Sequence, residues 1–194
     1  MELPFFTISD LDLDGKTVAM RVDINSPINP DTGEILSLKR IQEHVTSIKK
    51  VPKCKLILLA HQSRPGKKDF TSLREHAREL SILLERRVDF VDDLFGAKAI
   101  DAVKGMKDGD IILLENTRFY SEEVSLKDKS MTVQENTHII RRLSEYVDFF
   151  ISDAFSALHR SQPSLVGMCN VVPSCAGPLM EKELKALARI VNDP

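Results

Sequence analysis

Short apolar runs recur along the chain, separated by longer stretches with apolar residues every three or four positions. Each run lacks polar alternation, which is typical of a strand buried on both faces of a parallel sheet. The runs predict strands at 16–23, 55–60, 88–91, 110–114 and 149–153. Strands that alternate with helical stretches predict an α/β fold, a doubly wound parallel sheet flanked by helices.

The stretches between the strands predict amphipathic helices. They are expected at 37–50, 72–85, 93–104 and 132–146, with a last helix from Pro178. Ser37 is expected to cap the first helix, and Ser72 with Glu75 to form a capping box at the second. Pro178 suits the first turn of the last helix. The apolar face expected on that helix comprises Leu179, Leu184, Leu187, Ala188 and Val191.

The remaining segments are expected to be loops, at 25–36, 121–130 and 155–175. The second loop is charged, so Glu122 and Glu123 are expected to be solvated. Asp92 and Asp93 form another carboxylate pair, which is interpreted as a helix cap rather than a metal site.

Composition narrows the class of protein. A length of 194 residues suits one domain, or one domain with an appendage, and the net charge of -2 argues against a general nucleic-acid binder. Cys54, Cys169 and Cys175 form no C-x-x-C pair, so they indicate neither a zinc site nor disulfides and favour a reducing cytoplasm. The N-terminus lacks the basic start of a signal peptide, and no apolar run approaches the roughly 20 residues that span a bilayer. We therefore expect a soluble cytoplasmic protein with neither a membrane nor a nucleic-acid partner.

Polar residues follow the carboxyl ends of four predicted strands. These ends meet at one edge of a parallel sheet, where ligands bind in α/β folds. Asp23 and Asn25 follow the first strand and could receive ligand hydroxyls. The edge also collects His61, Arg64, Arg118, His159 and Arg160. Guanidinium groups bind carboxylate and phosphate in a bidentate manner, so we interpret this edge as a site for a small anion carrying both groups.

Each feature also has a purely structural interpretation. An arginine can pair with a nearby Asp or Glu on the surface, although three arginines doing so at one edge is a weaker explanation. Asp23 and Asn25 can satisfy loop backbone. A histidine beside several cations has little reason to hold its proton, so His61 and His159 are expected to be neutral hydrogen-bonding groups rather than acids.

No nucleotide-binding or hydrolytic motif is present in the sequence. It lacks G-x-x-x-x-G-K-[ST], G-x-G-x-x-G, H-E-x-x-H and G-x-S-x-G, it has no acidic metal cluster, and its eight glycines do not cluster. The sequence therefore predicts an anion pocket without a nucleotide pocket or a metal site.

Four segments at these strand ends resemble the N-terminal domain of the phosphoglycerate kinase family. They are R-V-D-I-N-S-P at 21–27, L-A-H-Q-S-R-P-G at 59–66, L-L-E-N-T-R-F-Y-S-E-E at 113–123 and D-A-F-S-A-L-H-R-S-Q at 153–162. A-G-P-L-M-E-K-E-L at 176–184 is similar to the family's passage into its interdomain helix. H-Q-S-R-P-G, followed by D-F and H-A, resembles the archaeal branch. The resemblance covers nearly the whole chain in order.

The resemblance implies a Rossmann-like domain that binds 3-phosphoglycerate through a basic patch. Asp23 and Asn25 would contact the hydroxyl and carboxylate end of the substrate. Its carboxylate and phosphate would be held by His61, Arg64, Arg118 and Arg160. Arg40, within S-L-K-R-I, would be the catalytic arginine that stabilises the phosphoryl group in transit. The reaction would be reversible phosphoryl transfer between 1,3-bisphosphoglycerate and ADP, giving 3-phosphoglycerate and ATP, with Mg²⁺ accompanying the nucleotide.

The resemblance also implies a division into domains. Residues 1–177 would form the 3-phosphoglycerate-binding domain and 178–194 the interdomain helix. The C-terminal domain of the family, which binds Mg²⁺ with ADP or ATP, would be absent, so the chain alone is expected to be inactive. Ser152 stands where the family usually has Asn, and Ser37 where an acidic residue is common; neither change removes a proposed ligand contact.

Two other functions stay open. One is a catalytically inactive anion-binding or regulatory module, although such a module would be free to lose Arg40. The other is an unrelated sugar-phosphate enzyme with the same sheet topology, which would need a general base that the sequence does not offer. An exposed apolar stripe on 179–191 would favour the kinase, because it would mark a missing domain interface.

Overall fold

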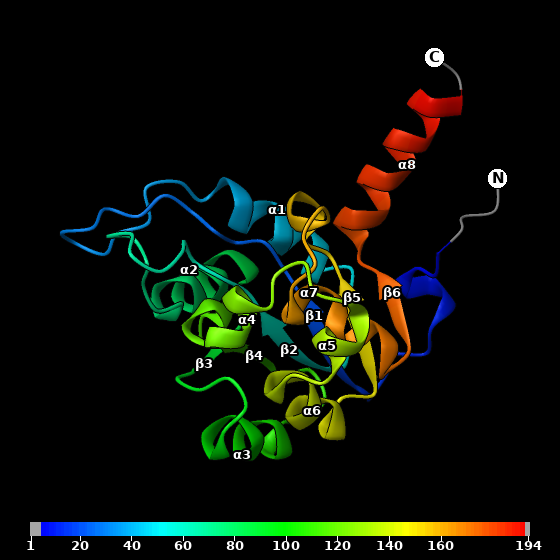
Figure 1. The fold of residues 1–194 in the computed structure, drawn as a ribbon, viewed down its shortest axis with the longest axis horizontal. Coiled ribbons are helices and arrows are strands. Elements are labelled where there is room, and N and C mark those ends of the chain that lie inside the picture. The colour runs from blue at the N-terminus through cyan, green and yellow to red at the C-terminus, as the bar shows by residue number, and fades with distance from the viewer. Residues whose placement is uncertain (1–4, 193–194) are drawn as a thin grey trace.

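The fold is built on six parallel strands in the order β3-β4-β2-β1-β5-β6 (Figure 1). The computed structural model describes residues 5–192. The strands are Thr17–Arg21 (β1), Lys55–Leu59 (β2), Asp89–Val91 (β3), Ile111–Leu114 (β4), Phe149–Ser152 (β5) and Ser174–Ala176 (β6). The predicted doubly wound parallel sheet is therefore confirmed, with five of its strands at the predicted places.

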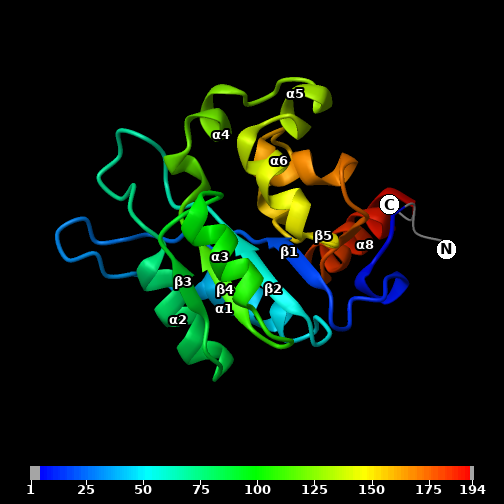
Figure 2. The ribbon, with the colours of Figure 1, turned by 90° about the horizontal axis from the view of Figure 1, so that it is seen from below.

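Helices cover both faces of the sheet, which is why its central strands are apolar without alternation. Figure 1 shows α1 (Lys39–Ile48) and α2 (Arg74–Leu84) on one face and α3 (Ala97–Gly105) and α6 (His138–Leu143) on the other. Figure 2 looks onto the face covered by α3 and α6. In β1, Val18 and Met20 lie in the core under α1 and α2, whereas Ala19 lies in the core under α3 and α6.

Three predicted helix starts differ from the structure. Helix α1 begins at Lys39 with Leu38 as its N-cap, so Ser37 does not cap it. The capping box predicted at α2 is also wrong: the helix begins at Arg74, and Glu75 instead pairs with Arg78 at 3.1 Å. Helix α3 begins at Ala97 rather than at Asp93, and its N-cap residue is Gly96. Asp93 nevertheless satisfies backbone N–H groups at this end, because its carboxylate accepts hydrogen bonds from Leu94, Gly96 and Ala99.

Two predicted loops contain regular structure. Segment 121–130 contains the short helix α4 (Ser121–Ser125), and segment 155–175 contains α7 (Pro163–Val166) and most of β6. The single helix predicted at 132–146 is divided into α5 (Met131–Glu135) and α6. At the break, the Thr137 hydroxyl donates to the Gln134 carbonyl at 2.8 Å, so a side chain replaces a helical hydrogen bond there.

The last helix, α8 (Pro178–Asn192), begins at the predicted proline and projects away from the sheet (Figure 1). On this helix Leu187 is 48% exposed, and Ile190, one turn further on, is 66% exposed. Val191, a member of the predicted apolar face, lies outside the residues whose side chains are described. No helix within residues 5–192 is both long and apolar enough to cross a membrane.

Gly177, between β6 and α8, is required by close packing. A Cβ atom there would lie 2.3 Å from Asp153 Oδ1 and 2.6 Å from Asp153 Cγ. Because Asp153 is completely buried and cannot move aside, we expect Gly177→Ala to lower the free energy of unfolding by about 1–3 kcal/mol in urea titrations followed by circular dichroism.

Gly105, the last residue of α3, is the matched control. A Cβ atom there meets no heavy atom within 4 Å, so Gly105→Ala should change stability by less than about 1 kcal/mol, in the stabilising direction. Equal stability of the two variants would contradict the close packing at Gly177.

Candidate anion-binding site

The candidate site lies at the point where the order of the strands in the sheet reverses, between β1 and β5. The chain passes from β1 to β2 on one side of β1 and later places β5 on its other side, and such a switch point leaves a crevice at the carboxyl ends of the strands. Asp23, after β1, meets Ser156, after β5: the Ser156 hydroxyl and the Arg40 guanidinium both donate to the Asp23 carboxylate. Loops from the two neighbouring strands therefore converge on one acidic group.

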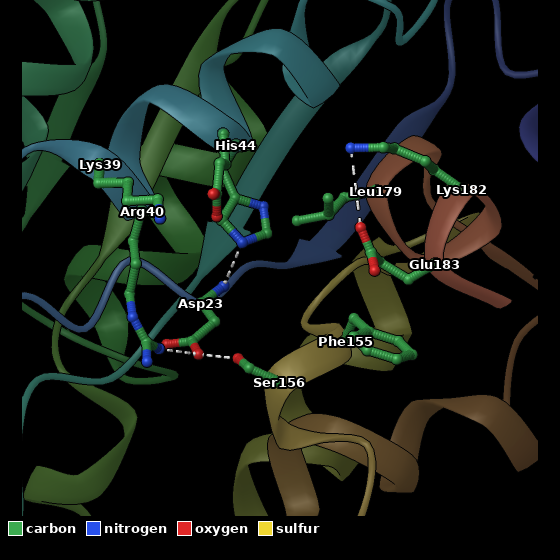
Figure 3. A pocket seen from close by; sticks show the side chains of 10 residues that line it. Asp23, Lys39, Arg40, His44, Phe155, Ser156, Leu179, Lys182 and Glu183 are labelled. Carbon is green, nitrogen blue, oxygen red and sulfur yellow. Dashed lines mark hydrogen bonds and ion pairs between the residues drawn. The ribbon is translucent and has the colours of Figure 1, made fainter. Parts of the chain in front are cut away.

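A cavity of about 290 Å³ opens beside this carboxylate (Figure 3). Its lining includes Lys39 and Arg40 from the first turn of α1, Phe155 and Ser156 after β5, and Leu179 and Lys182 of α8. Burial alone would raise the pKa of the Asp23 carboxyl, but the hydrogen bond from Ser156 and the nearby charges, including Arg40 and Arg21, outweigh it and hold that pKa below its ordinary value. The cavity is thus lined by acidic as well as basic side chains: Asp23, Glu43 and Glu183 beside Lys39, Arg40 and Lys182.

A completely buried arginine lies behind the site. Arg21, the last residue of β1, donates through Nε to Ser164 Oγ at 3.0 Å, through Nη1 to the Leu59 carbonyl at 3.3 Å and through Nη2 to His61 Nδ1 at 2.8 Å. Burial lowers the pKa of the guanidinium, while the charge of Glu123 opposes that change. Every side of this guanidinium is occupied by protein, so it supports the site rather than facing a ligand.

The buried counter-charge is Glu123, which corrects the prediction that this residue is solvated. Its Oε1 accepts from Ser164 Oγ at 2.5 Å and its Oε2 from Ser164 N at 2.9 Å. The Ser164 hydroxyl therefore bridges the two charged groups: it accepts a hydrogen bond from Arg21 Nε and donates one to the Glu123 carboxylate. Glu122, by contrast, is partly exposed and accepts from the His138 backbone N–H.

His61 is a neutral hydrogen-bonding group, as predicted. Burial, followed by the charges of Arg21 and Arg118, lowers the pKa of its ring from 6.5 to about 2. Since Nδ1 accepts the hydrogen bond from Arg21, the ring proton resides on Nε2, which is then available as a donor. His159 differs: its ring is exposed and accepts from Arg160 Nε at 3.2 Å.

The three predicted arginines follow β2, β4 and β5 at the same edge of the sheet. Arg118 donates to the Ser63 carbonyl at 2.5 Å, and Ser63 N donates to Asn25 Oδ1 at 2.8 Å, so the loops after β1, β2 and β4 are tied together. Burial and then the charges of Arg160 and Arg21 lower the pKa of Arg118, which places these cations close to one another. Arg64 is exposed, and its guanidinium makes no hydrogen bond within residues 5–192.

Among the sequence-predicted residues, contacts or electrostatic interactions link Asp23, Asn25, Arg40, His61, Arg118, His159 and Arg160, whereas Arg64 lies on the surface beside them. Sequence reasoning missed the layer behind them, which comprises Arg21, His44, Glu123 and Ser164. Arg21 did lie in a quoted segment, and a charge that ends an apolar central strand is the one signal that could have identified it. The other three carry no comparable local signal.

We expect Glu123→Gln to lower the free energy of unfolding by about 3–5 kcal/mol, because the variant leaves the buried Arg21 charge without its counter-charge. Urea titration measures the change. Glu145→Gln, at an exposed glutamate, is the control and should stay within about 0.5 kcal/mol of the wild type. Wild-type stability of Glu123→Gln would show that another group balances Arg21.

Acidification should destabilise the chain through His61. The folded state binds the ring proton only near pH 2, whereas the unfolded state binds it below about 6.5, so the contribution is present above 6.5 and is lost progressively as pH falls. Between pH 7.5 and pH 5 the loss from this group is about 2 kcal/mol. His61→Gln should reduce the difference in unfolding free energy between the two pH values by that amount, and the exposed His159→Gln should not. An unchanged difference in His61→Gln would contradict this assignment.

Comparison with known proteins places these features in a family. The family model described as phosphoglycerate kinase matches residues 8–194. The chain is 53% identical to phosphoglycerate kinase of Methanobacterium bryantii over 100% of its own length and 47% of that protein, and 51% identical to that of Thermoplasma acidophilum over 95% and 45%. These identities agree with the predicted archaeal resemblance.

Solved structures give the same answer. The crystal structure of phosphoglycerate kinase from Pyrococcus horikoshii OT3 matches with a TM-score of 0.90 at 40% identity, covering 95% of this chain and 45% of that one. The Coxiella burnetii enzyme matches with a TM-score of 0.79 at 32% identity, covering 98% and 46%. The chain spans about half the length of the relatives it matches, and it belongs to the phosphoglycerate kinase family.

Proposed function

We propose that this chain is the part of a phosphoglycerate kinase that binds 3-phosphoglycerate and 1,3-bisphosphoglycerate. One observation carries the proposal: Arg64, Arg118 and Arg160 follow strands at one edge of the sheet, and within residues 5–192 none of them forms an ion pair with a carboxylate. Surface pairing, the structural interpretation of these arginines, therefore does not account for them. Cations held together without a carboxylate in ion-pair contact favour a ligand with several negative charges.

The proposed contacts are those that the family resemblance implies, and the positions of these residues support them. Asp23 and Asn25 face the hydroxyl and carboxylate end of the ligand, and the Nε2–H of His61 donates to one of its oxygens. Arg64, Arg118 and Arg160 bind its carboxylate and phosphate. Holding such groups in place before reaction is the main demand of phosphoryl transfer.

Arg40 is the proposed catalytic residue. Its side chain is 46% exposed at the mouth of the cavity, where it pairs with Asp23. A guanidinium that is anchored at one end and open to the cavity is able to contact a phosphoryl group beside the bound acid and to neutralise its charge. The alternative, a catalytically inactive anion-binding module, gives no reason to keep an arginine at this place.

Phosphoryl transfer itself is proposed for the longer protein. Residues 1–177 would bind the acid and 178–194 would form the interdomain helix. The part of the family's length that this chain does not cover would bind ADP or ATP. As the family resemblance implies, Mg²⁺ would accompany the nucleotide bound by that other part, where it would neutralise phosphate charge. The exposed Leu187 and Ile190 on α8 are consistent with a contact to it. A cytoplasmic location and the lack of a nucleic-acid partner stay predictions from composition.

Titration of the isotope-labelled chain with 3-phosphoglycerate, followed by NMR, tests the proposal. We expect Arg64→Ala and Arg118→Ala each to weaken binding about 5–150-fold, corresponding to the loss of one charge-assisted contact of 1–3 kcal/mol. Arg141→Ala, at an exposed arginine of α6, should bind as the wild type does, and MgADP should not bind to this chain.

Unchanged affinity in both edge variants would contradict the site assignment. Binding of neither the acid nor the nucleotide by the wild-type chain would contradict the proposal that this half recognises the acid by itself.

A further inference from the structure

A buried histidine lies between the loop after β1 and the start of α8. His44, on α1, is only 2% exposed, and its Nε2 accepts from the Asp23 backbone N–H at 3.0 Å. Its Nδ1 lies 3.0 Å from Asp153 Oδ2. Because Nε2 is occupied as an acceptor, the neutral ring carries its proton on Nδ1 and donates it to Asp153. The ring therefore makes one directed hydrogen bond on each side.

Asp153 passes this connection to α8. The carboxylate is completely buried after β5, and its Oδ1 accepts from the backbone N–H groups of Leu179 at 2.8 Å and Met180 at 3.2 Å. These amides belong to the first turn of the helix, where a negative charge is favourable. Ser47 Oγ, one helical turn after His44, lies 3.3 Å from the same Leu179 N–H. Thus α1 and the loop after β5 together hold the start of α8.

The groups form an uninterrupted series: the Asp23 backbone, the His44 ring, the Asp153 carboxylate and the first turn of α8. At one end, the side chain of Asp23 is the acceptor for Arg40 and Ser156 at the mouth of the cavity. At the other end, α8 projects from the body of the molecule (Figure 1). Figure 3 shows His44 between Asp23 and the side of the cavity formed by Leu179.

Capping of α8 alone does not explain this arrangement. Asp153 with the two amides would suffice for a cap, and an apolar side chain at position 44 would fill the core. Instead, His44 Nε2 accepts a hydrogen bond from the backbone N–H of Asp23, the residue whose side chain lines the cavity, and so holds that backbone in place. A hydrogen bond at each end means that a displacement of the Asp23 loop changes the bond to Asp153, and so the position of the first turn of α8.

We propose that His44 is a positioning residue that couples the Asp23 loop to α8, so that an anion bound at Asp23 and Arg40 alters the first turn of the helix. The identity of the anion, 3-phosphoglycerate, rests on the function proposed above. The coupling itself does not, because it is defined by the hydrogen bonds around His44.

Two substitutions separate the two bonds of the ring. In His44→Asn, the amide nitrogen takes the place of Nδ1 and keeps the bond to Asp153, but nothing reaches the Asp23 N–H. In His44→Gln, the longer side chain places its amide oxygen near the position of Nε2 and keeps the bond to Asp23, while the bond to Asp153 is lost. Each variant preserves half of the connection, so coupling should fail in both. His138→Asn, at an exposed histidine of α6, is the control.

The readout is the NMR signal of the Leu179 and Met180 amides in the isotope-labelled chain. Two perturbations of the Asp23 loop are applied: titration with 3-phosphoglycerate, and the substitution Arg40→Ala, which removes the cation paired with Asp23 and needs no ligand. We expect both perturbations to shift these two amides in the wild type and in His138→Asn, and to shift them no more than the distant Ala99 amide in His44→Asn and His44→Gln.

The outcomes distinguish the coupling from the proposed function. If 3-phosphoglycerate shifts His61 but not Leu179 and Met180, the function stands and the coupling is overturned. If 3-phosphoglycerate shifts nothing, the proposed function fails, and the Arg40→Ala comparison still decides the coupling. Equal responses in the wild type and both His44 variants overturn it.

A measurement on the native ring covers the case in which the His44 variants do not fold. The ring nitrogen signals of His44 should show the Nδ1–H tautomer and should move together with the Leu179 and Met180 amides, both in the titration and on Arg40→Ala. A ring that stays unchanged while those amides move, or amides that stay unchanged under both perturbations, overturns the proposal.

Discussion

The buried charge of Arg21 is the constraint on which the site depends. Removing a guanidinium from water costs several kcal/mol unless hydrogen bonds and an opposite charge compensate. Here the compensation comes from segments far apart in the sequence: the Leu59 carbonyl, the His61 ring and Glu123 through Ser164. These contacts fix α4, α7 and the loop after β2 relative to β1. The same loops carry the groups that face a ligand.

The site combines clustered positive charge with an overall acidic chain. Like charges held together destabilise the folded state. Burial is the largest cause of the lowered pKa of Arg118, and the charges of Arg160 and Arg21 lower it further. A bound anion would remove much of the repulsion between these arginines. The same cluster of charges that lowers the stability of the ligand-free protein would therefore strengthen anion binding.

The sequence pattern predicted those elements whose burial is visible in a few consecutive residues. The apolar strands of four or five residues were evident because both of their faces are buried. The parallel topology then placed the residues that follow them at one edge of the sheet. Strand β6 was missed because three residues carry no period and are defined by pairing with distant residues, on β5 and at Thr7. Glu123 was misplaced because its partner Ser164 lies 41 residues away, and the capping box failed because the Leu73 N–H donates to Glu115, 42 residues away. Burial that depends on such distant partners leaves no local signal.

The distance between Arg21 and Ser164 also bears on the order in which the protein can be completed during synthesis. The two residues are 143 positions apart. At about 5–20 residues per second, the ribosome needs roughly 7–30 s to extend the nascent chain from one to the other. Once β2 (Lys55–Leu59) has also been made, β1 can pair with it, yet the guanidinium at the end of β1 still lacks both Ser164 and the link to Glu123. Because Ser164 is made only after most of the chain, we expect the contacts of Arg21, and with them the anion site, to be among the last parts of the domain to form.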